Sequence, residues 1–202
     1  MAAPTGDFIE RMPKVELHVH LEGSVEVATL VELAQRNGID LPRARIFAAR
    51  KTEGYASFDD FARALLMTVH CLRRAEDFEL LALRHGEAMH HQNIRYAEIT
   101  WTPQLYGHLR LPLDDIDLRR PRAAEAWGVE MRWIPDLVRS YPRPALRVQA
   151  WACSRKARDG GVVALGLGGP EREELEPEIR EALARARAAG LPANPHAGED
   201  AG

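Results

Sequence analysis

Residues 16–24, ELHVHLEGS, contain the feature on which both the fold and the chemistry depend. The stretch is typical of a buried strand, and His18 and His20 stand two positions apart within it. Alternate residues of a strand point to the same face, so both imidazoles emerge side by side, close to the strand's end. Two buried imidazoles without partners cost free energy. We therefore expect a polar or cationic partner to meet them there.

Strand-like and helical segments alternate along the whole chain. Expected strands cover residues 14–21, 93–103, 129–136, 161–171 and 191–198. Six helices are expected between them. The first is capped by Ser24 and ends at Gly38, and the second starts at Ser57. The others cover residues 76–91 before a left-handed Asn93, 113–127 with an interruption at Pro121, 143–158, and 176–189 before Gly190. This order favours parallel βαβ units wound in one sense. Both a (β/α)8 barrel and an open doubly wound sheet fit it.

The composition is that of a globular protein, with 46% hydrophobic and 28% charged residues and a net charge of −3. No basic stripe appears, which argues against nucleic-acid binding. No apolar run approaches the roughly 18 residues that a membrane span needs, and no signal segment is visible. Cys71 and Cys153 are too few for a disulfide framework. We expect a cytoplasmic protein with residues 1–202 in a single domain.

A third histidine, His196, lies at the end of the fifth expected strand. In a barrel the carboxyl ends of all strands meet at one mouth, so His18, His20 and His196 can share one ion. Three imidazoles suit a catalytic zinc ion, which also keeps a position open for water. Glu199 follows three residues later and is placed to move protons between water and substrate. The alternatives are histidines with ordinary hydrogen bonds and a solvated loop acid.

Four motifs resemble the adenosine deaminase family in their order and separation. They are PKVELHVHLEGS (13–24), NIRYAEITWTPQ (93–104), GVVALGLGGPE (161–171) and NPHAGED (194–200), and the similarity runs from about Met12 to the last residue. The resemblance implies a zinc-dependent (β/α)8 barrel that replaces the 6-amino group of a purine nucleoside by oxygen and releases ammonia. It makes His18, His20 and His196 ligands of one Zn²⁺ ion, and Glu199 the acid that protonates the purine N1.

The resemblance also implies a substrate-binding surface. Gly169 matches a glycine whose backbone contacts the purine ring, and Phe58, Phe61 and Leu65 fall where the family lines an apolar pocket, although ordinary helix-face packing explains these three equally well. His20 and Glu22 would face the substrate as well. Adenosine enzymes of the family usually carry Asp at the position of Glu22 and DLAGDE in place of GLGGPE. Aminodeoxyfutalosine and adenine deaminases are therefore alternative activities.

The family continues past HAGE with three more strands, a catalytic histidine and an aspartate that completes the metal site. Residues 1–202 are thus expected to form about five of eight strands, a C-terminally incomplete barrel. Two other functions compete with deamination: a related metal hydrolase of phosphoesters or lactones, and a truncated, inactive metal-binding paralogue. A dinucleotide site is disfavoured, since the pattern G-x-G-x-x-G requires glycine where Glu171 stands.

Overall fold

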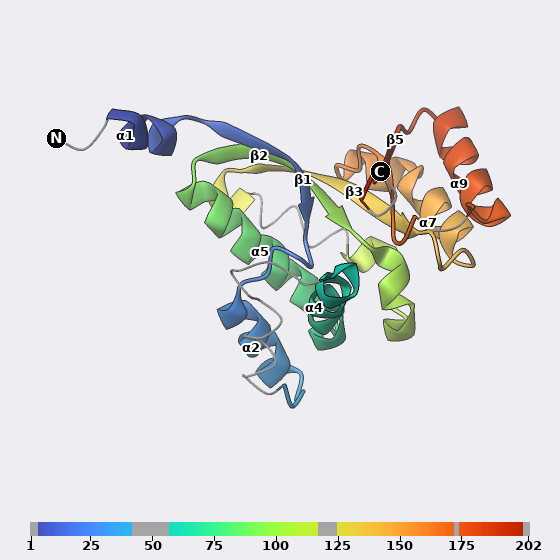
Figure 1. The fold of residues 1–202 in the computed structure, drawn as a ribbon, viewed down its shortest axis with the longest axis horizontal. Helices are drawn as coiled ribbons and strands as arrows, with labels where there is room; N and C mark the ends of the chain where they lie inside the picture. Colours follow the sequence, from blue (N-terminus) through green and yellow to red (C-terminus); the bar gives the residue numbers. More distant parts are fainter. Residues whose placement is uncertain (1–3, 42–56, 117–124, 172–173, 200–202) are drawn as a thin grey trace.

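The computed structural model describes residues 4–41, 57–116, 125–171 and 174–199. Figure 1 shows the arrangement of its helices and strands. In chain order the elements are α1 (Pro4–Arg11), β1 (Lys14–His20), α2 (Val27–Arg36), α4 (Phe58–Cys71), α5 (Ala75–His91), β2 (Ile94–Trp101), the 3₁₀ helix η1 (Pro103–Leu109), β3 (Glu130–Val138), α7 (Ala145–Ala152), α8 (Arg155–Asp159), β4 (Leu165–Gly168), α9 (Pro177–Ala188) and β5 (Ala193–Pro195).

The five strands form one parallel sheet whose spatial order is the chain order, β1-β2-β3-β4-β5. Each connection therefore places the next strand directly beside the previous one, always farther from β1 in the sheet order. A doubly wound sheet reverses direction at a switch point, whereas a barrel does not. The prediction of five parallel strands is confirmed, and the order selects the barrel over the open doubly wound sheet.

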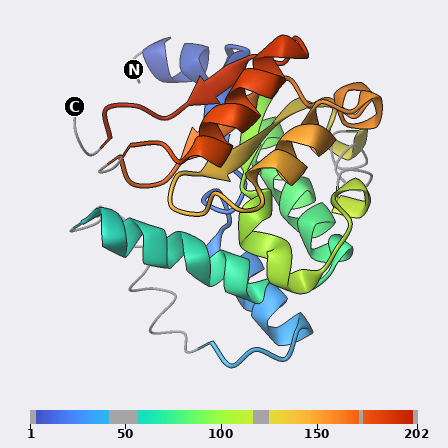
Figure 2. The same cartoon turned by 90° about the vertical axis from the view of Figure 1, so that its right-hand side faces the viewer.

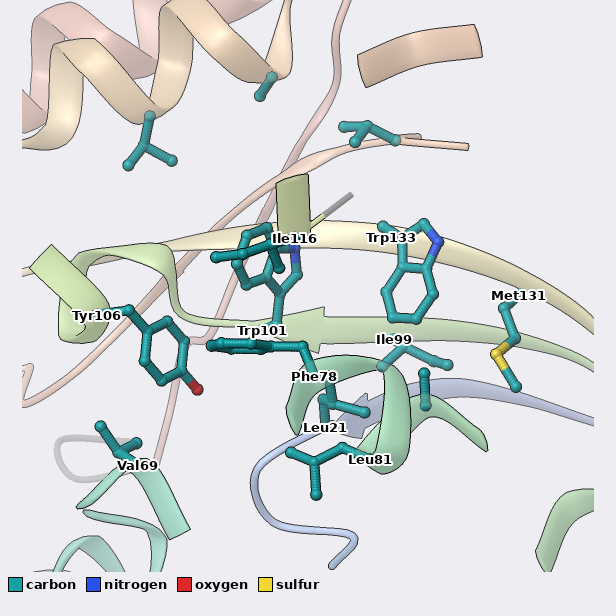
Figure 3. Packing of buried hydrophobic residues seen from close by; sticks show 14 of the residues in the cluster. Leu21, Val69, Phe78, Leu81, Ile99, Trp101, Tyr106, Ile116, Met131 and Trp133 are labelled. Atoms are coloured by element: carbon teal, nitrogen blue, oxygen red, sulfur yellow. The ribbon is translucent and has the colours of Figure 1, made fainter. Parts of the chain in front are cut away.

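Helices α5, α7 and α9 pack against β2, β3 and β5 respectively. Figures 1 and 2 show α2, α4 and α5 together on one side of the molecule, and α7 with α9 beside β3, β4 and β5. Large aromatic side chains fill the layer between the strands and these helices. Phe78 of α5 lies edge-on to Tyr106 of η1, with ring centroids 4.7 Å apart, and Trp101 of β2 packs near both (Figure 3). Burying such rings contributes much of the core's stability.

Several helix boundaries follow the expected signals. The Ser57 hydroxyl accepts a hydrogen bond from the backbone N–H of Asp60, at 3.2 Å, and so caps α4 as predicted. Asn93 and Gly190 adopt positive φ angles of 58° and 73° just after α5 and α9. These left-handed residues end their helices at the positions predicted from the sequence. The expected helix over residues 113–127 falls partly outside the described residues.

Four local predictions are wrong. Ser24 does not cap α2, because its hydroxyl donates to the carbonyl of Leu21 and the helix begins only at Val27. The helix expected over 143–158 is divided into α7 and α8, because the Ser154 side chain accepts from the backbone of the second helix and starts it anew. The strand expected over 161–171 is limited to Leu165–Gly168, and the one expected over 191–198 is limited to Ala193–Pro195, where prolines cannot donate to the ladder.

The first half of β1 has an outer face that the described residues leave uncovered. Val15 and Leu17 are 64% and 55% exposed, although they alternate with the inward-facing histidines and belong to the face that helices cover elsewhere. Phe8 and Ile9 of α1 are also largely exposed nearby in sequence. Within the described residues, no helix has both the length and the apolar character needed to cross a membrane.

Residues 1–202 expressed alone should therefore self-associate. An open strand edge beside apolar side chains invites pairing with another chain, and the paired substitution Val15→Lys, Leu17→Lys should reduce this association. Light scattering over a range of protein concentrations measures it, with the exposed Leu66→Lys variant of α4 as control. A monomer at every concentration, in the unsubstituted chain, would contradict this expectation.

Candidate metal centre and its surroundings

Three histidines from distant parts of the sequence meet at one point. His18 and His20 come from the end of β1, and His196 directly follows β5. One ring nitrogen from each histidine lies within 4.8 Å of the others, and the Nε2 atoms of His20 and His196 are 2.9 Å apart. The structure thus brings together the three residues that the sequence analysis selected as metal ligands.

This meeting shows how strongly the sheet curls. β1 and β5 are its two edges, and four strand spacings would separate the edges of a flat sheet by about 19 Å. The imidazole of His196 nevertheless lies with its centroid 4.6 Å from that of His18 and 5.0 Å from that of His20. The carboxyl ends of the edge strands are therefore folded toward each other, as in a partly closed barrel.

The protonation of the histidines suits a metal ion. The Nδ1 atom of His196 lies 3.0 Å from the carbonyl oxygen of Leu167, which can only accept, so in the neutral ring Nδ1 carries the proton and Nε2 has the lone pair. Burial, together with the neighbouring His196 and His18, lowers the pKa of His20 to about 4. His18 is exposed, yet partial desolvation and the neighbouring His196 lower its pKa as well. Neutral imidazoles are the form that binds metals.

The donor set therefore fits a zinc ion. The Nε2 atoms of His20 and His196 are 2.9 Å apart, so they can share a proton, and when neither Nε2 carries a proton both lone pairs can bind one cation. Three nitrogen ligands with room for water are the usual arrangement of catalytic zinc. Within the described residues, Nδ1 of His20 is buried without a hydrogen-bond partner. The orientation of this ring therefore depends on packing and on the contact that its Nε2 makes.

Glu199 lies beside the cluster with its side chain exposed. Its negative charge raises the pKa of His18, partly offsetting the effects of burial and of His196. Its backbone N–H donates to the carboxylate of Glu171, at 2.8 Å. Glu199 thus combines a fixed backbone with a solvent-accessible carboxylate close to the histidines, which is what a proton-transfer group needs.

Glu22 is fully buried, two residues after His20. Its Oε1 atom accepts from the backbone N–H of Thr102 at 2.9 Å and from the hydroxyl of Tyr106 at 2.5 Å. Burial, together with the charge of Glu22, raises the pKa of Tyr106 well above its ordinary value, so the phenol stays a donor. The contact of Glu22 with substrate stays a prediction, and this oxygen already has two donors within the protein.

The other predicted substrate-binding residues are more scattered. Gly169 has a φ angle of 88°, and a Cβ there would lie 3.3 Å from Cγ1 of Val138, so glycine is required for backbone reasons. Phe61 and Leu65 are half-buried on α4, and Leu65 packs against the core. The side chain of Phe58 lies outside the described residues. The predicted apolar pocket is thus untested by this structure.

Comparison with known proteins places this site in a family. A sequence model of the adenosine deaminase family matches residues 13–202. The chain belongs to the adenosine deaminase family. It is 34% identical over 196 residues to an aminodeoxyfutalosine deaminase from Acidothermus cellulolyticus, covering 95% of this chain and 54% of that protein. It is 34% identical over 201 residues to an adenine deaminase from Rhodospirillum rubrum, covering 96% of this chain and 58% of that protein.

Solved structures agree with the fold. An amidohydrolase from Burkholderia ambifaria with bound zinc superposes with a TM-score of 0.86 at 30% identity, over 98% of this chain and 56% of its own. An adenine deaminase from Arthrobacter aurescens gives a TM-score of 0.79 at 25% identity, over 93% of this chain and 58% of its own. This adenosine deaminase family chain thus spans little more than half the length of the proteins it matches.

The structure adds residues that the sequence analysis did not select. Asp136, near the end of β3, is 2% exposed, and its Oδ1 has no hydrogen-bond partner among the described residues. It pairs in register with Gly166 of β4, and a Cβ at Gly166 would lie 1.7 Å from that Oδ1. Burial, then the charges of Glu22 and Glu199, raise the pKa of Asp136 well above its ordinary value. No signal in a single sequence links this aspartate to a glycine on the next strand.

Asp136 and Gly166 should therefore be energetically coupled. Gly166→Ala alone forces the carboxyl out of its space and should lower the free energy of unfolding by about 1–3 kcal/mol. The same substitution in an Asp136→Ala background should cost much less, because the clashing atoms are gone. Urea denaturation of the two single variants and the double variant measures the coupling. Gly107→Ala, where a Cβ would meet nothing within 4 Å, is the control, and strictly additive effects would contradict the coupling.

Proposed function

We propose that this protein is a zinc-dependent hydrolase that removes the 6-amino group of an adenosine-type purine nucleoside and releases ammonia. The observation that carries the proposal is the meeting of His18, His20 and His196, whose ring nitrogens lie within 4.8 Å of one another. Membership of the adenosine deaminase family, and a zinc-containing neighbour of the same fold, support it.

Each of the four selected residues has a definable part in this reaction. His18, His20 and His196 would hold the zinc ion, which supplies Lewis acidity and lowers the pKa of water. Glu199 delivers a proton to N1 of the purine, which makes C6 electron-poor and open to attack by water. One proton of the attacking water passes to the amino group, the C6–N bond breaks, and ammonia leaves. The oxygen of water remains on C6 as a carbonyl, and the second water proton is released to solvent. The exposed Glu199 can be reprotonated from solvent.

Aminodeoxyfutalosine and adenine are the alternative substrates. Proteins named for these two activities are among the similar relatives, each 34% identical over nearly the whole of this chain. Glu22, where adenosine enzymes usually have Asp, supports considering them. Turnover of adenosine, aminodeoxyfutalosine and adenine, compared at equal concentrations in the protein expressed from its natural reading frame, decides among the three. An inactive metal-binding paralogue would turn over none of them.

The metal proposal predicts one zinc ion per chain and its loss from His20→Ala. Removing a ligand should weaken zinc binding by at least roughly tenfold, since even the loss of a partner behind a ligand often costs that much. Elemental analysis and competition with a chelator measure this change, and His70→Ala, an exposed histidine on α4, is the control. Equal, stoichiometric zinc in wild type and His20→Ala would refute the assignment.

The acid proposal predicts that Glu199→Gln keeps its zinc and loses activity. General acid–base groups contribute about 10²–10⁴-fold to rates, and the amide cannot protonate N1. Steady-state deamination and zinc content are measured together on the same samples. Glu181→Gln, an exposed position on α9, should change neither. Loss of the metal from Glu199→Gln would instead make Glu199 a ligand.

A further inference from the structure

Arg139 and Glu171 form a nearly buried ion pair beside the metal centre. Arg139 directly follows β3, and Glu171 lies in the loop after β4. Their side chains are only 13% and 12% exposed, and Nη2 of the guanidinium lies 3.8 Å from Oε1 of the carboxylate. Such a pair is costly to desolvate and is retained most readily where each charge also has hydrogen bonds to make.

The Arg139 guanidinium joins the ends of two strands. Its Nη1 donates to the carbonyl of Gly169 at 2.9 Å, and its Nη2 donates to the carbonyl of His196 at 2.7 Å. Regular pairing of β4 with β5 ends at Leu167, whose carbonyl accepts from the backbone of His196. Beyond this point the two segments have no ladder between them. The guanidinium group of Arg139 connects the two segments instead, with one N–H donated to each carbonyl.

Glu171 holds the next part of the same loop. Its Oε1 accepts from the backbone N–H of Gly198 at 2.9 Å, and its Oε2 accepts from the backbone N–H of Glu199 at 2.8 Å. Gly198 has a φ angle of 79°, which few other residues adopt. Both carboxylate oxygens therefore bind the backbone of the loop that carries Glu199.

We propose that Arg139 and Glu171 are a positioning pair, which fixes residues 196–199 so that the imidazole of His196 and the carboxylate of Glu199 serve the same substrate. Three backbone groups of this segment, the carbonyl of His196 and the amides of Gly198 and Glu199, are bound by these two side chains. Neither side chain needs to touch the substrate. The proposal rests on the proposed function for the role of Glu199, whereas its structural part does not.

The two members of the pair should have separable effects. Arg139 holds the carbonyl of a metal ligand, so its loss should loosen the metal. Glu171 holds the amide of the proton-transfer residue, so its loss should slow the reaction while the metal stays. If the pair only stabilised the fold through its charges, its two members would not differ in their effects on metal binding and on rate. Lys at position 139 would then replace Arg without loss of either.

The experiment uses the protein expressed from its natural reading frame and loaded with Co²⁺ as a spectroscopic probe. The variants are Arg139→Lys, Glu171→Gln and Glu171→Asp, with Glu181→Gln, which breaks an exposed ion pair on α9, as the matched control. Three quantities are measured: Co²⁺ affinity from its visible spectrum, backbone amide exchange at Gly198 and Glu199, and kcat and KM for whichever of adenosine, aminodeoxyfutalosine and adenine is turned over. Urea midpoints identify any variant that is simply unfolded.

Arg139→Lys should weaken Co²⁺ binding by roughly 10–100-fold, because one ammonium group cannot present the two-pronged fork. Glu171→Gln should bind Co²⁺ like wild type, exchange the amides of Gly198 and Glu199 faster, and lower kcat by up to roughly 100-fold with little change in KM. Glu171→Asp keeps both acceptor oxygens and should lie between wild type and Glu171→Gln in exchange and kcat.

Wild-type Co²⁺ affinity in Arg139→Lys, or unchanged amide exchange in Glu171→Gln, would overturn the proposal. Equal losses of stability, metal and activity in all three variants would also overturn it, in favour of a purely structural pair. If the wild type deaminates none of the three purines, the proposed function fails. The metal and exchange measurements then still decide whether the pair positions this segment.

Discussion

The 2.9 Å separation between Nε2 of His20 and Nε2 of His196 is the constraint from which the rest of the site follows. These atoms belong to the two edges of one parallel sheet, so the strands between them have to curl until the edges meet. Curling narrows the inner face of the middle strands. On β4 both Gly166 and Gly168 lie against Asp136: a Cβ would lie 1.7 Å from its Oδ1 at Gly166 and 3.3 Å from its Oδ2 at Gly168. Glycines on β4 therefore leave room for the side chain of Asp136 beside this strand.

The narrow interior also arranges the acids around the histidines. Glu22 and Asp136 are both buried, but Glu22 has the amide of Thr102 and the phenol of Tyr106 as donors. Asp136 has space over Gly166 and one oxygen without a donor among the described residues, while the fork of Arg139 binds two carbonyls instead. A buried carboxylate oxygen without a donor disfavours the charged form of its group. Burial, then the charges of Glu22 and Glu199, raise the pKa of Asp136 well above its ordinary value, so the proton favours Asp136.

Much of this architecture is readable from sequence because it depends on short-range periodicity. The spacing of His18 and His20 fixes a shared strand face, and the alternation of strands and helices gives the parallel sheet. What the sequence hides are pairings across strands: Asp136 with Gly166, and Arg139 with the carbonyl of His196. Such contacts depend on register and curl, which no local pattern encodes. The predicted cap at Ser24 was wrong for a related reason: a serine hydroxyl can bond to several nearby backbone groups, and here it donates to the carbonyl of Leu21.

The environments of the three acids decide which one can carry a proton through repeated turnovers. A general acid has to regain its proton from solvent after each reaction and also reach the same substrate atom every time. Glu22 is fixed but buried, and Asp136 is buried over a glycine, so neither exchanges readily with water. Glu199 alone among the three has an exposed carboxylate, and Glu171 holds its backbone in place. A fixed backbone and an exposed side chain together give Glu199 the surroundings that the proposed general acid requires.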